Sequence, residues 1–205
     1  MKGTVAMGFT FLPLAFRMKF IARWGLMRNT QPENVQEHSL MVAQIAHALA
    51  VIRREVFRGE ASPDRCAALA MYHDATEIFT GDLPTPIKYM NRDITCAYKA
   101  VEEGARLRLI DMLPPELRGA YAPLLSPDEA SCEWRLVKAA DRISAYLKCV
   151  EEKKAGNSEF LRAAEGILAS ITALGLPEAE YFMEHFLPSF SLSLDEQEQG
   201  EECLK

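Results

Sequence analysis

A histidine, an aspartate and a glutamate fall inside one largely apolar run, at His73, Asp74 and Glu77. On a helix of about 3.6 residues per turn, this spacing places the three side chains on one face. Imidazole nitrogen and carboxylate oxygen are ligands that first-row divalent cations accept. A carboxylate in apolar surroundings is costly unless a partner or a metal ion offsets its charge. The segment therefore predicts a metal site, and its alternative is a hydrogen-bonded histidine beside surface acids.

Two further candidate ligands lie far from this segment in the sequence. His38 falls in the first turn of a long apolar helix, within the segment ENVQEHS. Asp141 lies at the edge of an inward stripe at helical spacing, formed by Val137, Ala140, Ser144 and Leu147. An acid beside such a stripe is more informative than an exposed acid. Pairing with Lys138 or Arg142 is the alternative explanation for Asp141.

The other two histidines are predicted to take no part in the chemistry. His47 follows His38 by nine residues, which places it on the opposite side of the same helix. His185 lies in a late amphipathic segment, YFMEHFLP, where a packing role is the simpler interpretation.

The elements that must position these residues are predicted to be helices. Asn34 is a predicted N-cap with Glu37 at the capping-box position, and Ser62 followed by Pro63 begins a second helix that continues to Gly81. The other helices are predicted at 93–112, from about 128 to 154, at 158–174 and at 177–187. No run of alternating β-branched residues is long enough for a sheet, so the predicted fold class is all-α.

The length and charge of the chain restrict the classes of function. The 205 residues, 49% of them apolar, suit one domain, predicted at 1–196, followed by an acidic tail at 197–205 that is predicted to be disordered. A net charge of −6 argues against binding to polymeric nucleic acid, which normally requires a basic face. A small anionic substrate remains possible, because a few cations or a metal ion can hold one phosphate.

Two features predict a cytoplasmic location. The five cysteines are dispersed without a CxxC pair, which is typical of reduced thiols. The apolar run at 5–16 is interrupted by Pro13, lacks a cleavage site and is shorter than the roughly 20 residues that span a membrane. We expect it to be a helix or an extended segment packed on the core, with no membrane association.

The candidate ligands resemble the signature of the HD-domain metal-dependent phosphohydrolases. They occur in the order His38, His73-Asp74 and Asp141, spread over three predicted helices. Longer blocks resemble the bacterial YfbR-type 5′-deoxynucleotidases, namely RWGLMRN (23–29), ENVQEHS (33–39), LAMYHDATEIFTGDLPTPIKY (69–89), AYLKCVEE (145–152) and PSFSLSLDE (188–196). The resemblance covers the chain from about 16 to 196 and implies a single-domain HD-domain helical bundle.

The resemblance also implies a set of residue roles. A metal ion would be held by His38, His73, Asp74 and Asp141, and Glu77 would be the acid–base residue beside it. Arg23 would contact the phosphate, and Trp24 would pack near the sugar. The nucleoside side of the pocket would be shaped by Asp82, Leu83, Pro84 and Thr85, and the substrate would also contact His38, Asp74 and Asp141.

The implied substrate is a deoxyribonucleoside 5′-monophosphate, hydrolysed to a deoxyribonucleoside and phosphate by a homodimer. The implied cofactor is one divalent transition metal (Co²⁺, Mn²⁺, Fe²⁺ or Zn²⁺), because two-metal HD proteins recruit further histidines and this chain has four in all. One alternative is hydrolysis of a nucleoside triphosphate or an alarmone, which needs more cations than Arg23, Arg28 and Lys88. The other is a non-catalytic nucleotide sensor, which would be expected to lack a ligand or the glutamate.

Overall fold

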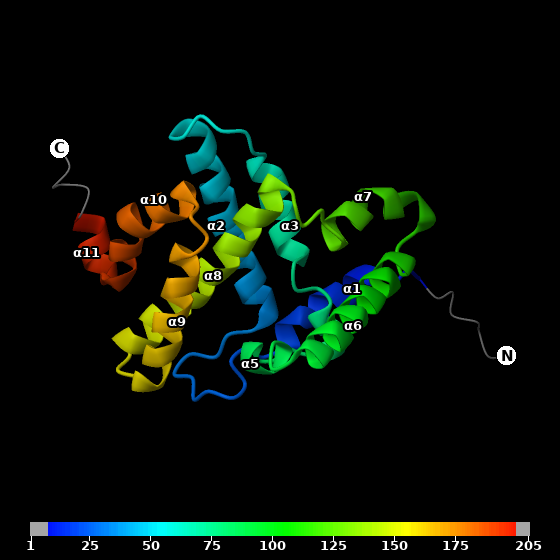
Figure 1. The fold of residues 1–205 in the computed structure, drawn as a ribbon, viewed down its shortest axis with the longest axis horizontal. Helices are drawn as coiled ribbons and strands as arrows, with labels where there is room; N and C mark the ends of the chain where they lie inside the picture. The colour runs from blue at the N-terminus through cyan, green and yellow to red at the C-terminus, as the bar shows by residue number, and fades with distance from the viewer. Residues whose placement is uncertain (1–7, 200–205) are drawn as a thin grey trace.

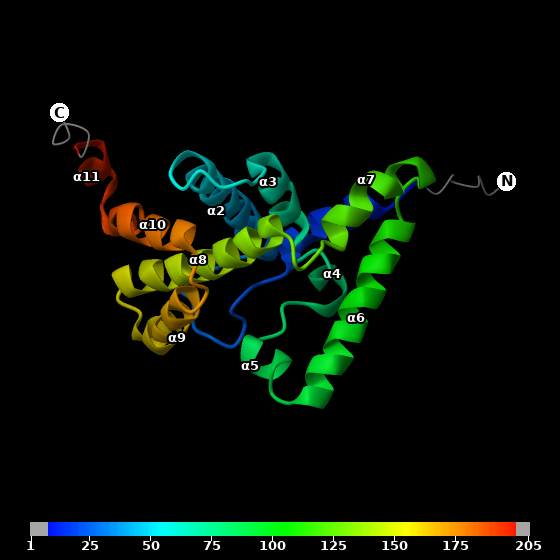
Figure 2. The same ribbon diagram turned by 45° about the horizontal axis from the view of Figure 1, so that its top comes forward.

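The computed structural model describes residues 8–199, and within them the only β structure is an isolated bridge between Ala22 and Asn34. The predicted all-α class is therefore confirmed, as a single helical domain. Three helices form its centre: α2 (Val35–Glu55), α3 (Pro63–Tyr72) and α8 (Cys132–Lys154). Figures 1 and 2 show α3 and α8 beside α2, against which both pack most extensively.

Two of these helices begin where the sequence predicts. The Asn34 side chain accepts hydrogen bonds from the backbone N–H groups of Gln36 and Glu37, and the Glu37 carboxylate accepts one from the Asn34 N–H. This capping box satisfies backbone donors at the start of α2. At α3, the Ser62 hydroxyl accepts from the Arg65 N–H, with Pro63 in the first turn.

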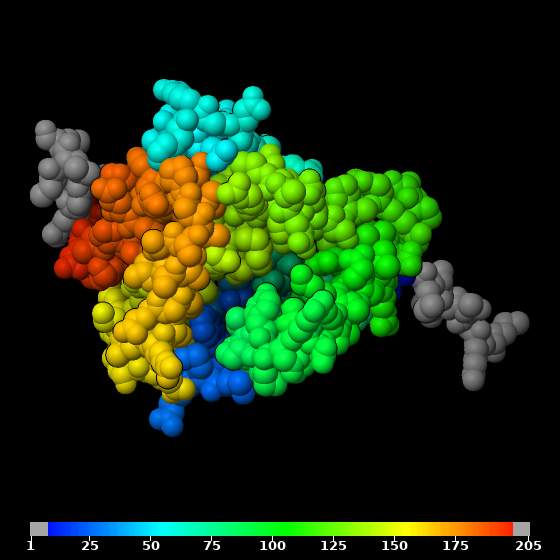
Figure 3. Space-filling view, viewed as in Figure 1, coloured from blue at the N-terminus to red at the C-terminus, as the bar shows by residue number. Residues whose placement is uncertain are grey.

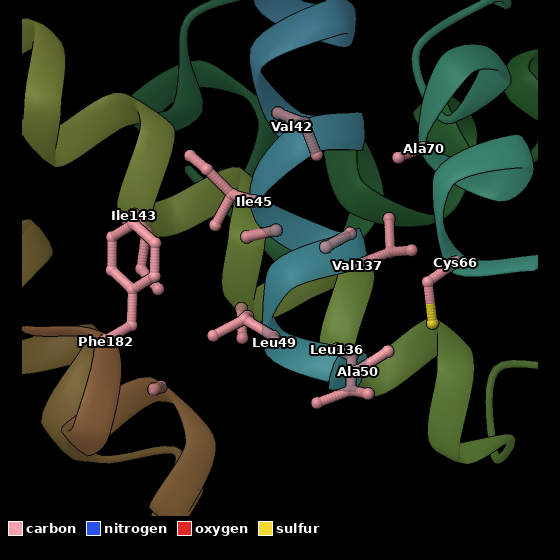
Figure 4. Packing of buried hydrophobic residues seen from close by; sticks show 14 of the residues in the cluster. Val42, Ile45, Leu49, Ala50, Cys66, Ala70, Leu136, Val137, Ile143 and Phe182 are labelled. Atoms are coloured by element: carbon pink, nitrogen blue, oxygen red, sulfur yellow. The ribbon is translucent and has the colours of Figure 1, made fainter. Parts of the chain in front are cut away.

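The larger of two buried apolar clusters joins α2, α3 and α8 to α9 (Leu161–Thr172) and α10 (Pro177–His185). Figure 4 shows side chains from α2, α3, α8 and α10 meeting there, among them Leu49, Cys66, Val137 and Phe182. Burial of one leucine or isoleucine side chain stabilises a fold by roughly 1.5–3 kcal/mol, so this cluster holds the central helices together.

The second cluster lies around the N-terminal part of the described chain and two later helices. It includes Phe11 of α1 (Phe11–Ala15), Met18 of η1 (Phe16–Phe20), Leu109 of α6 (Arg92–Asp111) and Leu125 of α7 (Pro115–Leu125). The apolar segment predicted at 5–16 is thus helical from Phe11 and packs on the core. Its residues 5–7 lie outside the described part of the chain.

The predicted helix from Ser62 to Gly81 is wrong between residues 73 and 76. The structure ends α3 at Tyr72, forms tight turns, and begins the short α4 (Glu77–Thr80) after them. The physical reason is that the carbonyl of Ala70 accepts from both the His73 backbone N–H and the His73 ring, so it is not free for the next helical turn. Gly81, at φ +70°, then ends α4.

Other boundaries also differ from the prediction. The helix predicted from about 128 begins at Cys132, because Ser131 is its N-cap and Asp128 lies in the preceding turn. Helix α7 occupies a segment for which no helix was predicted. Helix α11 (Leu194–Gln199) extends into the predicted tail, of which residues 200–205 lie outside the described part.

The remaining elements connect the long helices: α5 (Thr85–Lys88), η2 (Ser158–Phe160) and η3 (Leu187–Ser191). Among residues 8–199, no helix is both long and apolar enough to cross a membrane. Figure 3 shows the viewed face hollowed between the yellow-orange residues of α9 and the green residues of α5, with blue residues from around the start of α2 at the floor.

Candidate active site

His38 and Asp141 meet across the contact between α2 and α8. The His38 side chain is fully buried, and its Nε2 lies 3.1 Å from Oδ1 of Asp141 and 3.7 Å from Oδ2 of Asp74. Its other nitrogen, Nδ1, lies 3.2 Å from the hydroxyl of Ser144, one turn after Asp141 on α8. The capped first turn of α2 therefore directs Nε2 toward the two carboxylates.

His73 reaches the same point from the end of α3. Its Nδ1 lies 2.8 Å from the carbonyl oxygen of Ala70, which can only accept, so Nδ1 carries a proton and Nε2 is the nitrogen available to a metal ion. Nε2 lies 3.0 Å from Oδ2 of Asp74 and 3.9 Å from Oδ1 of Asp141. It is buried and has no hydrogen-bond partner.

Three of these four side chains, His38, His73 and Asp74, form a candidate site for a divalent metal ion. Ligand atoms of His38, His73 and Asp74 all lie within 4.8 Å of one another, and Asp141 contacts both rings. Metal–nitrogen and metal–oxygen bonds of about 2.0–2.2 Å place neighbouring ligand atoms roughly 3 Å apart. A metal ion would supply a partner for Nε2 of His73, which is buried and has no hydrogen-bond partner.

Both carboxylates have lowered pKa values, which favour the ionised form that a metal ligand requires. Burial on its own raises the pKa of Asp74, but His73 and His38 outweigh it and lower that pKa well below its usual range. Burial likewise opposes the ionisation of Asp141, and Lys138 and His38 overcome it and lower its pKa. Nζ of Lys138 lies 3.1 Å from Oδ2 of Asp141, so the ion pair considered from the sequence exists beside the contact with His38.

Glu77, the first residue of α4, is the buried acid next to this group. Its side chain is 3% exposed, Oε1 accepts a hydrogen bond from Nζ of Lys88 at 3.1 Å, and Oε2 has no partner. Burial and the negative charge of Asp74 raise the pKa of Glu77 to about 8, against the opposing charge of Lys88. A carboxyl group with such a pKa can hold and release a proton near neutral pH.

Arg23 and Trp24 lie on the segment that precedes α2. Nη1 of Arg23 lies 3.4 Å from Oδ2 of Asp74, which brings a guanidinium to the edge of the four ligand candidates. The indole N–H of Trp24 donates to Oε2 of Glu33 at 2.9 Å, and its ring packs on Phe160 with centroids 5.3 Å apart.

This segment is anchored from the far end of α8. The buried carboxylate of Glu152 accepts hydrogen bonds from the backbone N–H groups of Thr30 (3.0 Å) and Gln31 (3.2 Å). Asn157 also donates to it at 2.8 Å, and Lys148 pairs with it. The network holds the loop that carries Arg23 and Trp24 against the core.

The residues predicted as a pocket wall follow Gly81. Asp82 is close enough to Arg23 and Glu77 to act on the charge of each. Leu83 and Pro84 are half-buried and Thr85 is exposed. Within residues 8–199, no hydrogen bond joins these last three side chains to the ligand candidates, so their place in a pocket stays a prediction.

The two remaining histidines lie away from the site, as predicted. His47 is exposed on α2, and His185 is exposed on α10, where its ring packs 4.2 Å from that of Tyr181.

Sequence reasoning did not assign site roles to Glu33 and Lys138. Glu33 belongs to the segment ENVQEHS, directly before the N-cap of α2, and Lys138 precedes Asp141 by one helical turn. Their positions next to these motifs could have indicated that Glu33 and Lys138 lie at the site.

The comparison with known protein families matches residues 10–190 to the family described as 5′-deoxynucleotidase YfbR-like. The chain belongs to this YfbR-like family. A YfbR-like relative from Erwinia tasmaniensis, named 5′-deoxynucleotidase, is 54% identical over 181 residues, which cover 88% of this chain and 91% of the relative. The 5′-deoxynucleotidase YfbR of Escherichia coli is 55% identical over 181 residues, with the same coverage of 88% and 91%.

Solved structures show the fold of the YfbR-like chain to be that of HD-domain phosphohydrolases. One from Listeria innocua matches with a TM-score of 0.78 and 22% identity, covering 95% of this chain and 96% of that one. The HD phosphohydrolase DatZ of cyanophage S-2L, solved with dA and one catalytic Zn²⁺ ion, matches with a TM-score of 0.64 and 18% identity, covering 89% and 99%. The predicted HD-domain helical bundle is confirmed.

Proposed function

We propose that this protein is a divalent-metal-dependent 5′-deoxynucleotidase, which hydrolyses deoxyribonucleoside 5′-monophosphates to deoxyribonucleosides and phosphate. The observation that carries the proposal is the meeting of two histidine Nε2 atoms with two ionised carboxylates beside a buried acid, Glu77. It is supported by the 55% identity to a protein of that name across most of the chain.

The proposed ligands of the metal ion are His38, His73, Asp74 and Asp141. Two imidazoles and two carboxylates suit Co²⁺, Mn²⁺, Fe²⁺ or Zn²⁺, and the order of affinity alone does not select one of them. When bound, such an ion lowers the pKa of a coordinated water and offsets negative charge on the phosphate.

The proposed reaction is a direct hydrolysis. A water oxygen forms a bond to phosphorus and the bond from phosphorus to O5′ breaks, while one proton of the water passes to O5′ and the other stays on the released phosphate. Glu77 moves the proton that passes to O5′, because its buried carboxyl can hold and release a proton near neutral pH. Arg23 presents a fork of donors suited to phosphate oxygens.

Recognition of the nucleoside is proposed to come from Trp24 and from residues 82–85. An indole packed against C2′ leaves no room for a hydroxyl group, so deoxyribose is accepted and ribose is not. Pro84 gives the wall segment a fixed φ, and its neighbours Asp82, Leu83 and Thr85 line the nucleoside side.

The experiment that tests the proposal is phosphate release from dAMP, AMP and dATP by chelator-treated protein with each divalent metal restored in turn. We expect metal-dependent release from dAMP, with AMP and dATP nearly inert. Release of triphosphate from dATP, with no phosphate from dAMP, would instead identify a triphosphohydrolase. Tight nucleotide binding without release from any of the three would identify a sensor.

A homodimer belongs to the proposal as well. The α10–η3 segment leaves Phe186 and Phe190 45% and 39% exposed, which gives apolar material for contact with a second copy. Sedimentation velocity is expected to give the mass of two chains for the wild type and of one chain for Phe186→Ser. A wild-type protein that sediments as one chain would contradict the proposal.

A cytoplasmic location is also proposed, because Cys66, Cys96, Cys132 and Cys149 are free thiols. Fractionation of the source cells should recover the protein with cytoplasmic markers, and recovery with the membrane or the periplasm would contradict this.

A further inference from the structure

Glu33 is a buried carboxylate that the proposed reaction does not use. It precedes the N-cap of α2 and is 9% exposed. Its carbonyl accepts a hydrogen bond from the backbone N–H of Arg23 at 2.9 Å, next to the bridge between Ala22 and Asn34. The backbone therefore holds Glu33 directly opposite the residue proposed to bind phosphate.

The Glu33 carboxylate contacts three residues of the candidate site. Oε2 accepts from the indole N–H of Trp24 at 2.9 Å and lies 3.4 Å from Nε of Arg23, and Oε1 lies 3.6 Å from Nδ1 of His38. A buried carboxylate is costly without partners. Here, His38 and Arg23 overcome the effect of burial and lower the pKa of Glu33.

Trp24 needs such a contact because its backbone is strained. It has φ +58°, in the left-handed region that residues other than glycine rarely adopt. Such a conformation persists only where the surroundings impose it. The side chain of Asn29 donates to the Trp24 carbonyl at 3.3 Å, Phe160 supports the ring, and Glu33 occupies the single donor of the indole.

We propose that Glu33 is a positioning residue that fixes the Trp24 indole and the Arg23 guanidinium toward the nucleotide, and thereby sets the discrimination between deoxyribose and ribose. This inference rests on the proposed function. His38 has a second partner for Nδ1 in Ser144, at 3.2 Å. Loss of the Glu33 carboxylate should therefore change the positions of Trp24 and Arg23 more than the position of His38.

The test measures kcat/KM for dAMP and for AMP in Glu33→Ala, Glu33→Gln, Trp24→Phe and the double variant Glu33→Ala/Trp24→Phe. Losing a hydrogen bond to a charged group costs about tenfold or more, so we expect Glu33→Ala to lower the dAMP-to-AMP ratio by about that factor. Trp24→Phe, which removes only the N–H donor and the outer part of the ring, should lower it too. The double variant should fall no further than the lower single variant, because both changes break the same contact.

Glu33→Gln is the rescue variant, because its amide oxygen can still accept from the indole N–H. It should keep the dAMP-to-AMP ratio within about twofold of wild type while its KM rises, since Arg23 loses its ion pair. Glu55→Ala is the matched control, at a glutamate that is 62% exposed at the far end of α2, and should leave the ratio unchanged. If Glu33→Ala slowed both substrates equally, the carboxylate would have only a structural role and the proposal would fail.

A second measurement separates this inference from the proposed function. In a Trp134→Phe background, where Trp24 is the remaining tryptophan, acrylamide quenching should increase with Glu33→Ala and change little with Glu33→Gln. Equal quenching in the Trp134→Phe background and in its Glu33→Ala and Glu33→Gln variants would overturn the inference, even if dAMP is the substrate. If the wild-type protein showed no metal-dependent dAMP hydrolysis, the proposed function and the proposed sugar discrimination would both fail. Increased quenching in Glu33→Ala would still establish that Glu33 positions Trp24.

Discussion

The two ring nitrogens of His73 have separate tasks, and a backbone contact assigns them. Nδ1 donates to the carbonyl of Ala70, and Nε2 faces Asp74 and Asp141 as the nitrogen available to a metal ion. Metal-binding histidines are oriented in this way by a hydrogen bond at the nitrogen that does not bind the ion. At this residue, the same contact ends α3 and prepares a ligand.

The first residue-scale prediction concerns metal content. His38→Ala removes a buried ligand candidate and should lower bound divalent metal per chain at least tenfold after dialysis, because one of four ligands is lost. His47→Ala is the matched control, since His47 lies exposed on the same helix. Elemental analysis measures both variants, and full metal content in His38→Ala would contradict the proposed ligand set.

The second prediction concerns Glu77. Glu77→Ala should lower kcat for dAMP by about 10²–10⁴-fold, the usual contribution of a positioned acid–base group. Metal content and calorimetric binding of dAMP should stay near the wild-type values, because Glu77 is not one of the proposed ligands.

The control for Glu77 is Glu55→Gln, at a side chain that is 62% exposed at the end of α2. Its kcat should equal that of wild type. Near-normal turnover in Glu77→Ala would show that the proton moves by another route.

The site residues differ in how far sequence could predict them. His73, Asp74 and Glu77 lie within one short segment, so they are near one another although turns replace the predicted helix at 73–76. The meeting of His38 with Asp141 required the resemblance to a family, because no local pattern joins α2 to α8. The contacts of Glu33 with Trp24 and Arg23 depend on how the loop before α2 folds back, and no spacing rule describes such a loop.

At the scale of elements, the starts of α2 and α3 were predictable from their caps. Asn34 and Ser62 mark the true starts of α2 and α3, because their side chains satisfy backbone donors wherever the helix later packs. The end of α3 was not predictable from the apolar pattern, which continues past Tyr72. A ring-to-carbonyl contact at His73 overrides that pattern.

The third prediction tests how α8 supports the segment that carries Arg23 and Trp24. Glu152→Gln leaves Lys148 as a buried charge without its partner and weakens the hold on Thr30 and Gln31. Removing one member of a buried ion pair costs about 3–5 kcal/mol. Urea unfolding should show a loss of this size in the free energy of unfolding, and Glu151→Gln, at the exposed neighbouring position, should show almost none.

The pH dependence of this loss follows from the Glu152 pKa. Burial opposes its ionisation, but Lys148, Asn157 and Thr30 lower its pKa below the ordinary value of 4.5. A group with a lowered folded-state pKa stabilises the fold above its unfolded pKa, and this stabilisation is lost as the pH falls. The difference between wild type and Glu152→Gln should therefore shrink below about pH 4.5. A constant difference down to pH 3 would contradict the assignment.

At the scale of the whole molecule, the ligand candidates lie where the two apolar clusters meet. On α2, His38 stands between Val35 of the second cluster and Val42 of the first. After α3, Asp74 stands between Ala70 of the first cluster and Ala75 of the second. The candidate site thus lies at the boundary between the two apolar clusters.

This boundary has a consequence for cooperative unfolding. An ion shared by His38, His73, Asp74 and Asp141 would tie the two clusters into one unit, since neither could open without releasing it. A ligand at about 100 times its Kd adds about 2.7 kcal/mol to the free energy of unfolding. We expect calorimetry to show one sharp transition with metal, and after chelation a lower and broader one in which α6 and α7 melt before the central helices. An unchanged melting profile after complete removal of the metal would show that the two clusters already unfold as one.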